Sequence, residues 1–117
     1  MLAATVLGFL GVALGAFGAH ALKLDGKPLE WWHTGSQYHL VHALAALIAA
    51  LLGAPRAGWF FVGGAIVFAG SLYLMAVTGM TWLGAVTPIG GLCFLTGWGL
   101  LAWHASRQPA EPVVPAP

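Results

Sequence analysis

The sequence predicts an all-α integral membrane protein, built as a bundle of four transmembrane helices. Residues of the AVILMFWYC set make up 60% of the chain and charged residues only 6%, whereas an ordinary soluble domain carries about 25% charged residues. No Asp, Glu, Lys or Arg occurs in residues 1–22, 31–55 or 57–106. A spanning helix needs roughly 20 apolar residues, so the first two stretches each fit one helix and the third fits two.

Turn and cap residues place the ends of these helices. The predicted helices cover about 2–22, 36–52, 58–78 and 87–105, and together form a transmembrane domain over residues 1–106. Pro28 is expected to open a short interfacial helix in the polar connection 23–35. Ser36 and Thr87 are predicted N-caps. Residues 107–117 contain four prolines, which predicts a disordered, extended tail.

Four crossings define two sides of the predicted membrane domain. Both termini and the Pro55-Arg56 turn lie on one side, here named face two, and the connections 23–35 and 79–86 lie on the other, face one. Most tryptophans fall near one of these sides, as indoles at the headgroup level do; Trp98 alone lies more than a turn inside a helix. Orientation stays open, because each side carries two basic residues: Lys23 and Lys27 against Arg56 and Arg107.

A set of polar residues is the candidate functional site, and we expect it in the half of the bundle nearest face one. Its members are His20, Gln37, Tyr38, His42, Ser71, Tyr73 and Thr87. Tyr38 and His42 share one side of a helix, and His39 and His42 are also neighbours.

Two interpretations of this polar cluster remain open. An unsatisfied polar group in hydrocarbon costs several kcal/mol, so these side chains are expected to pair between helices. Alternatively His20, His39 and His42 hold a haem or a transition metal, since neutral imidazole ligates Zn, Cu and Fe.

Other classes of function find little support in the sequence. A net charge of +1 without a basic run gives no reason to expect a nucleic-acid partner. Cys93 is the only cysteine, which excludes a disulfide within one chain. No nucleophile elbow, HExxH or phosphate loop is present, which favours a non-enzymatic protein.

The expected partners are the lipid bilayer, another membrane protein, or a second copy of the chain. Self-association would use stripes of small residues, which let helix backbones approach closely. These stripes comprise Gly8, Gly11, Gly15 and Ala19 in the first helix and Ala65 and Ala69 in the third. Packing within one bundle is the preferred use of both stripes.

Several stretches together carry a family resemblance. They are Gly15-Ala-Phe-Gly-Ala-His-Ala-Leu22, Trp32 to His42 with its Thr34-Gly35 and Gln37-Tyr38, Phe68-Ala-Gly-Ser-Leu-Tyr73, and Gly84-Ala-Val-Thr-Pro-Ile-Gly-Gly91 followed by Gly97-Trp98. With these motifs the chain resembles the YgdD-like and YwdK-like family of uncharacterised small bacterial inner-membrane proteins, also described as domain of unknown function 423. The resemblance implies a multi-pass protein of the bacterial inner (plasma) membrane and supplies no enzyme class. It covers the seven residues of the polar cluster, whereas His39 stands where the family often carries other polar residues.

The function expected from the sequence is that of a non-enzymatic accessory or assembly factor, without a cofactor, that binds lipid or another membrane protein. The alternative is a haem- or metal-binding membrane redox protein using His20 and His42. A small oligomeric transporter or channel is a third possibility.

Overall fold

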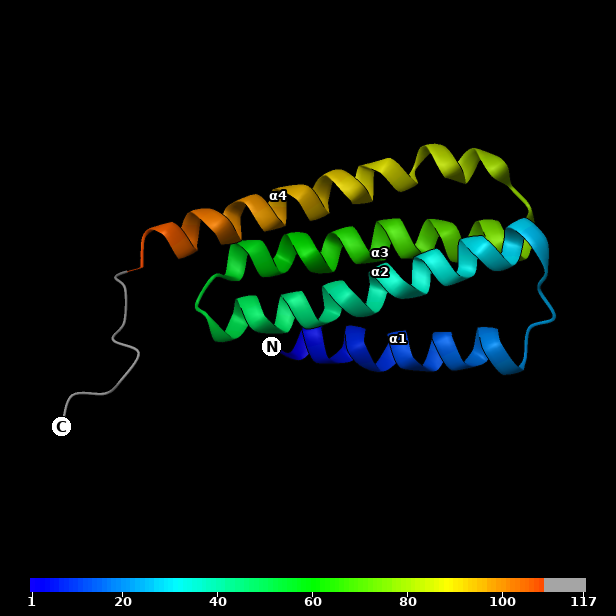
Figure 1. Cartoon of the computed structure of the whole chain (residues 1–117), viewed down its shortest axis with the longest axis horizontal. Helices are drawn as coiled ribbons and strands as arrows, with labels where there is room; N and C mark the ends of the chain where they lie inside the picture. Colours follow the sequence, from blue (N-terminus) through cyan, green and yellow to red (C-terminus); the bar gives the residue numbers. More distant parts are fainter. Residues whose placement is uncertain (109–117) are drawn as a thin grey trace.

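The computed structural model describes residues 1–108, and within them the chain is helical almost throughout. Its elements are α1 (Leu2–His20), α2 (Gly26–Leu51), α3 (Pro55–Thr78), the 3-10 helix η1 (Thr81–Ala85) and α4 (Thr87–Ser106). The α-helices run alternately up and down. Met1, the α2–α3 turn and the end of α4 therefore lie at one end, face two, and the other two connections lie at face one (Figure 1). The predicted all-α fold of four helices is confirmed, whereas the predicted tail lies, beyond Gln108, outside the described residues.

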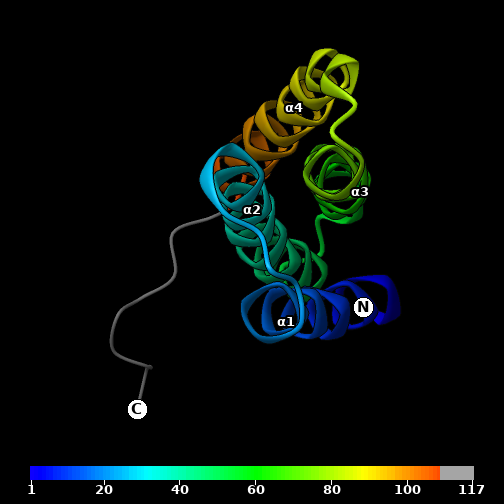
Figure 2. The same ribbon diagram turned by 90° about the vertical axis from the view of Figure 1, so that its right-hand side faces the viewer.

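The four helices do not surround a single central core. α2 and α3 form a central pair, with α1 on one side of it and α4 on the other (Figure 2). The α2–α3 and α3–α4 interfaces are extensive, α1 packs mainly on α2, and α1 barely touches α3. The two outer helices consequently leave most of their surface facing outward.

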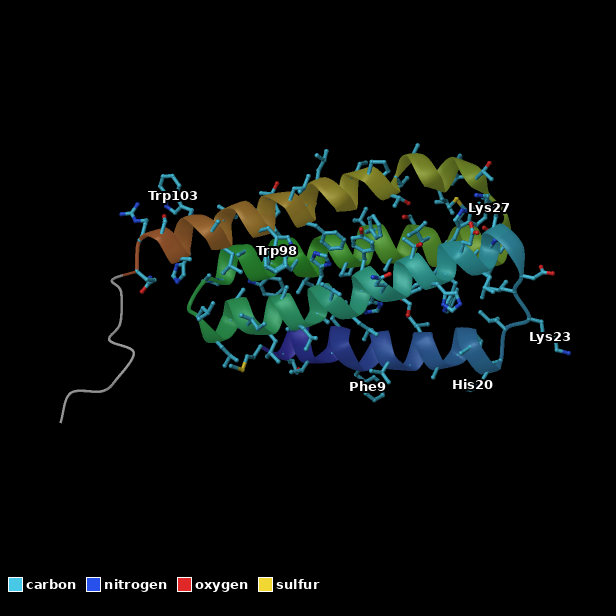
Figure 3. The ribbon with its side chains drawn as sticks, viewed as in Figure 1. Phe9, His20, Lys23, Lys27, Trp98 and Trp103 are labelled. Atoms are coloured by element: carbon cyan, nitrogen blue, oxygen red, sulfur yellow. The ribbon has the colours of Figure 1, made fainter. Side chains whose placement is uncertain are left out.

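This outward surface is apolar, and polar side chains lie inside. Phe9 is 74% exposed and points away from α1 (Figure 3), while His39 and His42 are each only 4% exposed. A water-soluble protein shows the opposite pattern. Within residues 1–108, three segments are long and apolar enough to cross a membrane: Leu2–His20, Pro55–Thr78 and Thr81–Ser106. α2, which carries both buried histidines, is not among them.

The second helix begins at Gly26, ten residues before the predicted start, so the predicted N-cap at Ser36 is wrong. Pro28 is compatible with a helix here because the backbone N–H groups of a first turn have no intrahelical acceptor. Gly35 lies inside this helix, where the absence of a side chain lets α3 pack closely against it. A Cβ on Gly35 would lie 3.2 Å from the Leu72 Cβ and 3.5 Å from the Ala69 carbonyl oxygen of α3. The predicted short interfacial helix is therefore the first part of one continuous α2.

Thr87 also departs from its predicted role as an N-cap. It is the first residue of α4, and its side chain makes no capping hydrogen bond. Its hydroxyl instead lies 2.5 Å from the Ser71 hydroxyl of α3. α3 ends before Gly79, whose φ of 72° is the left-handed conformation that commonly closes helices.

Small residues bring the helices together as the sequence predicts. In α1, Gly11 faces His39 and Leu40, and Gly15 faces Ser36, so this part of the stripe packs on α2. Between α3 and α4 the closest approach is at Gly90, where a Cβ would lie 2.5 Å from the Phe68 backbone nitrogen and 2.8 Å from the Gly64 carbonyl oxygen. These contacts are with backbone, so no side-chain rotation relieves them.

We expect Gly90→Ala to destabilise the bundle by about 1–3 kcal/mol, because the added methyl group forces α4 away from α3. The neighbouring Gly91→Ala is a matched control, since nothing lies within 4 Å of its Cβ position. Unfolding of both variants in mixed detergent micelles measures the difference. Equal stability of the two variants would contradict the described α3–α4 interface.

Candidate functional site

His39 connects three helices through its imidazole ring. Its Nε2 lies 2.8 Å from the Leu7 carbonyl oxygen of α1, and its Nδ1 lies 3.0 Å from the Tyr73 hydroxyl of α3. A carbonyl oxygen only accepts, so Nε2–H donates to it, and the Nδ1 of a neutral ring then accepts from the Tyr73 hydroxyl. Both ring nitrogens of this buried side chain are thereby satisfied.

His42 makes a corresponding connection from α2 to α4. Its Nδ1 donates to the Tyr38 carbonyl oxygen at 2.8 Å, and the Trp98 indole N–H donates to its Nε2 at 3.1 Å. Because an indole is only a donor, His42 is the neutral Nδ1–H tautomer. The Phe94 ring stacks on the imidazole, with centroids 3.6 Å apart and planes 10° from parallel. Trp98 extends from the inner side of α4 (Figure 3).

Two further contacts complete the internal polar pairing. The Ser71 hydroxyl donates to the Phe68 carbonyl oxygen at 2.9 Å and lies beside Thr87. The Trp32 indole donates to the Leu14 carbonyl oxygen of α1 at 3.1 Å. In residues 1–108 no buried side-chain nitrogen or oxygen lacks a hydrogen-bond partner. This full pairing is what an apolar surrounding requires.

The predicted residues therefore form several separate groups, and the expectation of one cluster near face one is wrong. At 1.5 Å per residue, His42 lies about 24 Å along α2 from Gly26 and about 14 Å from Leu51, in the half nearest face two. His20 is exposed at the face-one end of α1 (Figure 3). Gln37 is also exposed and joins none of these groups. The error follows from the late start predicted for α2, which made His42 seem close to that helix's beginning.

His39 and His42 do not converge on one ligand site in this arrangement. His39 faces α1 and α3, whereas His42 faces α4, and their ring nitrogens are occupied by other groups. Within residues 1–108, no group of three or more His, Cys, Asp or Glu side chains is arranged to hold a metal ion. The short spacing of the two histidines in the sequence thus reflects two separate helix contacts.

Three contributors to the network were not among the expected members of the cluster. Trp98 is the one tryptophan that the sequence places deep inside a helix, and this position is a usable signal, because an indole N–H away from water needs an acceptor. Trp32 was expected at the interface, yet it is buried against Tyr73, with ring centroids 4.4 Å apart. His39 is a candidate metal ligand in the sequence and not a member of the predicted cluster, although it is the residue that joins three helices.

Comparison of the sequence with known proteins finds a matching family. Residues 14–91 match the family described as "Protein of unknown function (DUF423)". The membrane protein YwdK of Bacillus subtilis is 43% identical over 108 residues, covering 84% of this chain and 88% of that protein. The inner membrane protein YgdD of Escherichia coli is 39% identical over 113 residues, covering 89% and 86%. No solved structure matches the chain.

A double-mutant cycle measures the bond between α2 and α3. We expect His39→Leu and Tyr73→Phe to show a coupling energy of about 0.6 kcal/mol, and at most about 1.7 kcal/mol, as buried hydrogen bonds in membrane proteins do. Pairing His39→Leu with Tyr38→Phe is the control and should give a coupling near zero, because the Tyr38 hydroxyl does not bond to His39. A coupling no larger for Tyr73 than for Tyr38 would refute the assigned hydrogen bond.

Proposed function

This chain belongs to the DUF423 family of membrane proteins, and we propose that it is a non-enzymatic accessory factor that crosses the inner (plasma) membrane four times and contacts another membrane protein through α2. The proposal rests on the division of the predicted polar cluster into an internal and an external part. The internal part holds the bundle together. The external part is what remains for a partner.

Four crossings follow from the directions of the helices. α1 and α3 run the same way, from face two to face one (Figure 1). If both span the membrane, the chain between them must cross back, and α2 is the segment that does so. Its 26 residues correspond to about 39 Å, which exceeds the roughly 30 Å of the hydrocarbon layer. Its two buried histidines, His39 and His42, are accommodated because α2 lies between α1, α3 and α4.

The exposed side chain of Gln37 is the feature that favours a protein partner. It is exposed near the middle of α2, about 17 Å from Gly26, and within residues 1–108 no hydrogen bond is formed by its side chain. An amide facing hydrocarbon without a partner costs several kcal/mol. A neighbouring helix that supplies a donor and an acceptor removes this cost, and glutamine is one of the residues that join membrane helices in this way.

Tyr38 follows Gln37 in α2 and points about 100° further around the helix. It is 43% exposed, although its ring also packs against Phe68 with centroids 4.7 Å apart. The phenol is therefore held in place by the bundle while part of it faces outward. A partly buried aromatic ring beside a polar side chain is a common composition for a protein contact.

A non-enzymatic role agrees with the internal chemistry. The ring nitrogens of His39 and His42 and the Tyr73 hydroxyl are bound to one another, to the Trp98 indole or to backbone carbonyls. This leaves none of them directed at a substrate. Their arrangement supports a structural role for the buried polar residues. The Gln37 amide and the Tyr38 phenol are then exposed polar groups near the middle of α2 that a partner can reach.

We expect Gln37→Leu to abolish a membrane complex that the wild-type chain maintains. Leucine is compatible with the surrounding lipid, but it cannot form a hydrogen bond with the partner helix. The measurement is native electrophoresis of membrane complexes with quantitative proteomics in four strains: wild type, deletion, Gln37→Leu and Leu44→Ala. Leu44 lies seven residues along the same side of α2 and is also exposed. Its variant should match the wild type, while Gln37→Leu should match the deletion.

Complexes of unchanged size and abundance in the deletion strain would refute the accessory role. A deletion effect shared equally by Gln37→Leu and Leu44→Ala would refute the assignment of the contact to Gln37. The abundance of each variant in the membrane is measured in parallel, so that loss of the protein is not mistaken for loss of the contact.

A further inference from the structure

The face-two end of the bundle contains a basic cavity. It has a volume of about 650 Å³ and lies between the α2–α3 turn, the start of α3 and the end of α4. Arg56 and Arg107 both line it, together with His104 and Trp103. In residues 1–108 the two acidic side chains, Asp25 and Glu30, are both at the opposite end, face one. The two guanidinium groups therefore share a cavity without a described carboxylate to neutralise them.

The walls of this cavity are tied together by specific contacts. The His104 Nε2 donates to the Leu52 carbonyl oxygen at 2.9 Å, which fastens the last turn of α4 to the turn between α2 and α3. The Arg107 guanidinium lies over the Trp103 ring, 5.8 Å from its centroid, in a cation–π contact. At the start of α3, Pro55 has no N–H, and the next backbone N–H groups have no acceptor one turn back. This helix end adds positive potential on the same side.

An apolar groove adjoins the basic cavity. It measures about 400 Å³ and is lined by Arg56, Trp59, Phe60, Gly63 and Cys93. Arg56 lines both spaces, so the two meet at its side chain. From Arg56 to Gly63 the groove follows α3 for about 10 Å away from face two, toward the middle of the bundle.

We propose that this pair of spaces binds an anionic phospholipid, with the headgroup phosphate at Arg56 and Arg107 and an acyl chain in the groove beside Trp59 and Gly63. A phosphate suits paired guanidinium groups because their N–H donors match its oxygens. Basic pockets between membrane helices are known sites for anionic headgroups. The apolar groove continues from the basic cavity at Arg56 toward the acyl chains. A phospholipid would fill both spaces, whereas a free phosphate would need only the basic cavity. This site is separate from the α2 surface of the proposed function and does not depend on it.

The experiment is native mass spectrometry of the purified full chain, titrated in detergent with phosphatidylglycerol or with phosphatidylcholine of the same acyl chains. The wild type should bind one phosphatidylglycerol in preference to phosphatidylcholine. Arg56→Gln/Arg107→Gln should weaken that binding by about 30-fold, as expected for two basic contacts near a membrane surface. Lys23→Gln/Lys27→Gln removes the same charge at face one and should bind as the wild type does.

A second pair of variants tests the groove. Gly63→Leu fills it, and nothing lies within 4 Å of the Gly63 Cβ position, so the bundle accommodates the change. Gly70→Leu is the control, because it lies two turns further along α3, also has open space, and does not line the groove. Gly63→Leu should weaken phosphatidylglycerol binding by at least fivefold and Gly70→Leu should not.

Three results would overturn the proposal. Equal loss of binding in the face-one and face-two charge variants would show general attraction of anionic lipid. Equal effects of Gly63→Leu and Gly70→Leu on phosphatidylglycerol binding would show that the acyl chain does not occupy the groove. Competition by millimolar inorganic phosphate would assign the cavity to a free anion. Circular dichroism of each variant establishes that it is folded.

Discussion

The requirement that polar groups buried within a membrane bundle be hydrogen-bonded shapes the interior of this protein. His39 fulfils this requirement with a single side chain, because a neutral imidazole has one donor and one acceptor on different sides of its ring. Its position in α2, between Leu7 of α1 and Tyr73 of α3, uses both at once. His42 uses the other tautomer to reach α4 through Trp98. One helix with two histidines therefore contacts all three others.

These polar contacts matter most where packing contributes least. α1 buries little of its surface: only Ala4, Leu7, Gly11 and Gly18 are buried in it. Its carbonyl groups at Leu7 and Leu14 accept hydrogen bonds from His39 and Trp32 of α2. Lipid replaces water outside the bundle, so burial of apolar surface between helices gives no hydrophobic gain, and close packing with hydrogen bonds must hold the helices together. α1 thus depends on two side-chain bonds and a stripe of glycines.

Much of the fold is predictable from where charges and prolines fall, because both mark helix ends independently of tertiary structure. The start of α2 is not predictable in this way, since Ser36 resembles an N-cap and Pro28 the start of a separate short helix until Gly35 is seen packed against α3. The partners of His39 and His42 depend on how each helix is rotated about its axis. Residues three apart differ by about 60° around a helix, enough to send these two rings to different neighbours. The position of Trp98 inside α4 was the one local clue to a buried acceptor.

The histidine tautomers test this account most directly. Solid-state ¹⁵N NMR of the imidazoles in bilayers at pH 7, with assignment by His39→Gln and His42→Gln, distinguishes Nε2–H from Nδ1–H rings. The account predicts a neutral Nε2–H ring for His39 and a neutral Nδ1–H ring for His42, the second changing its shifts in Trp98→Phe. Exchange between tautomers at both positions, or the shifts of metal-bound nitrogen, would contradict a bundle held together by these two rings.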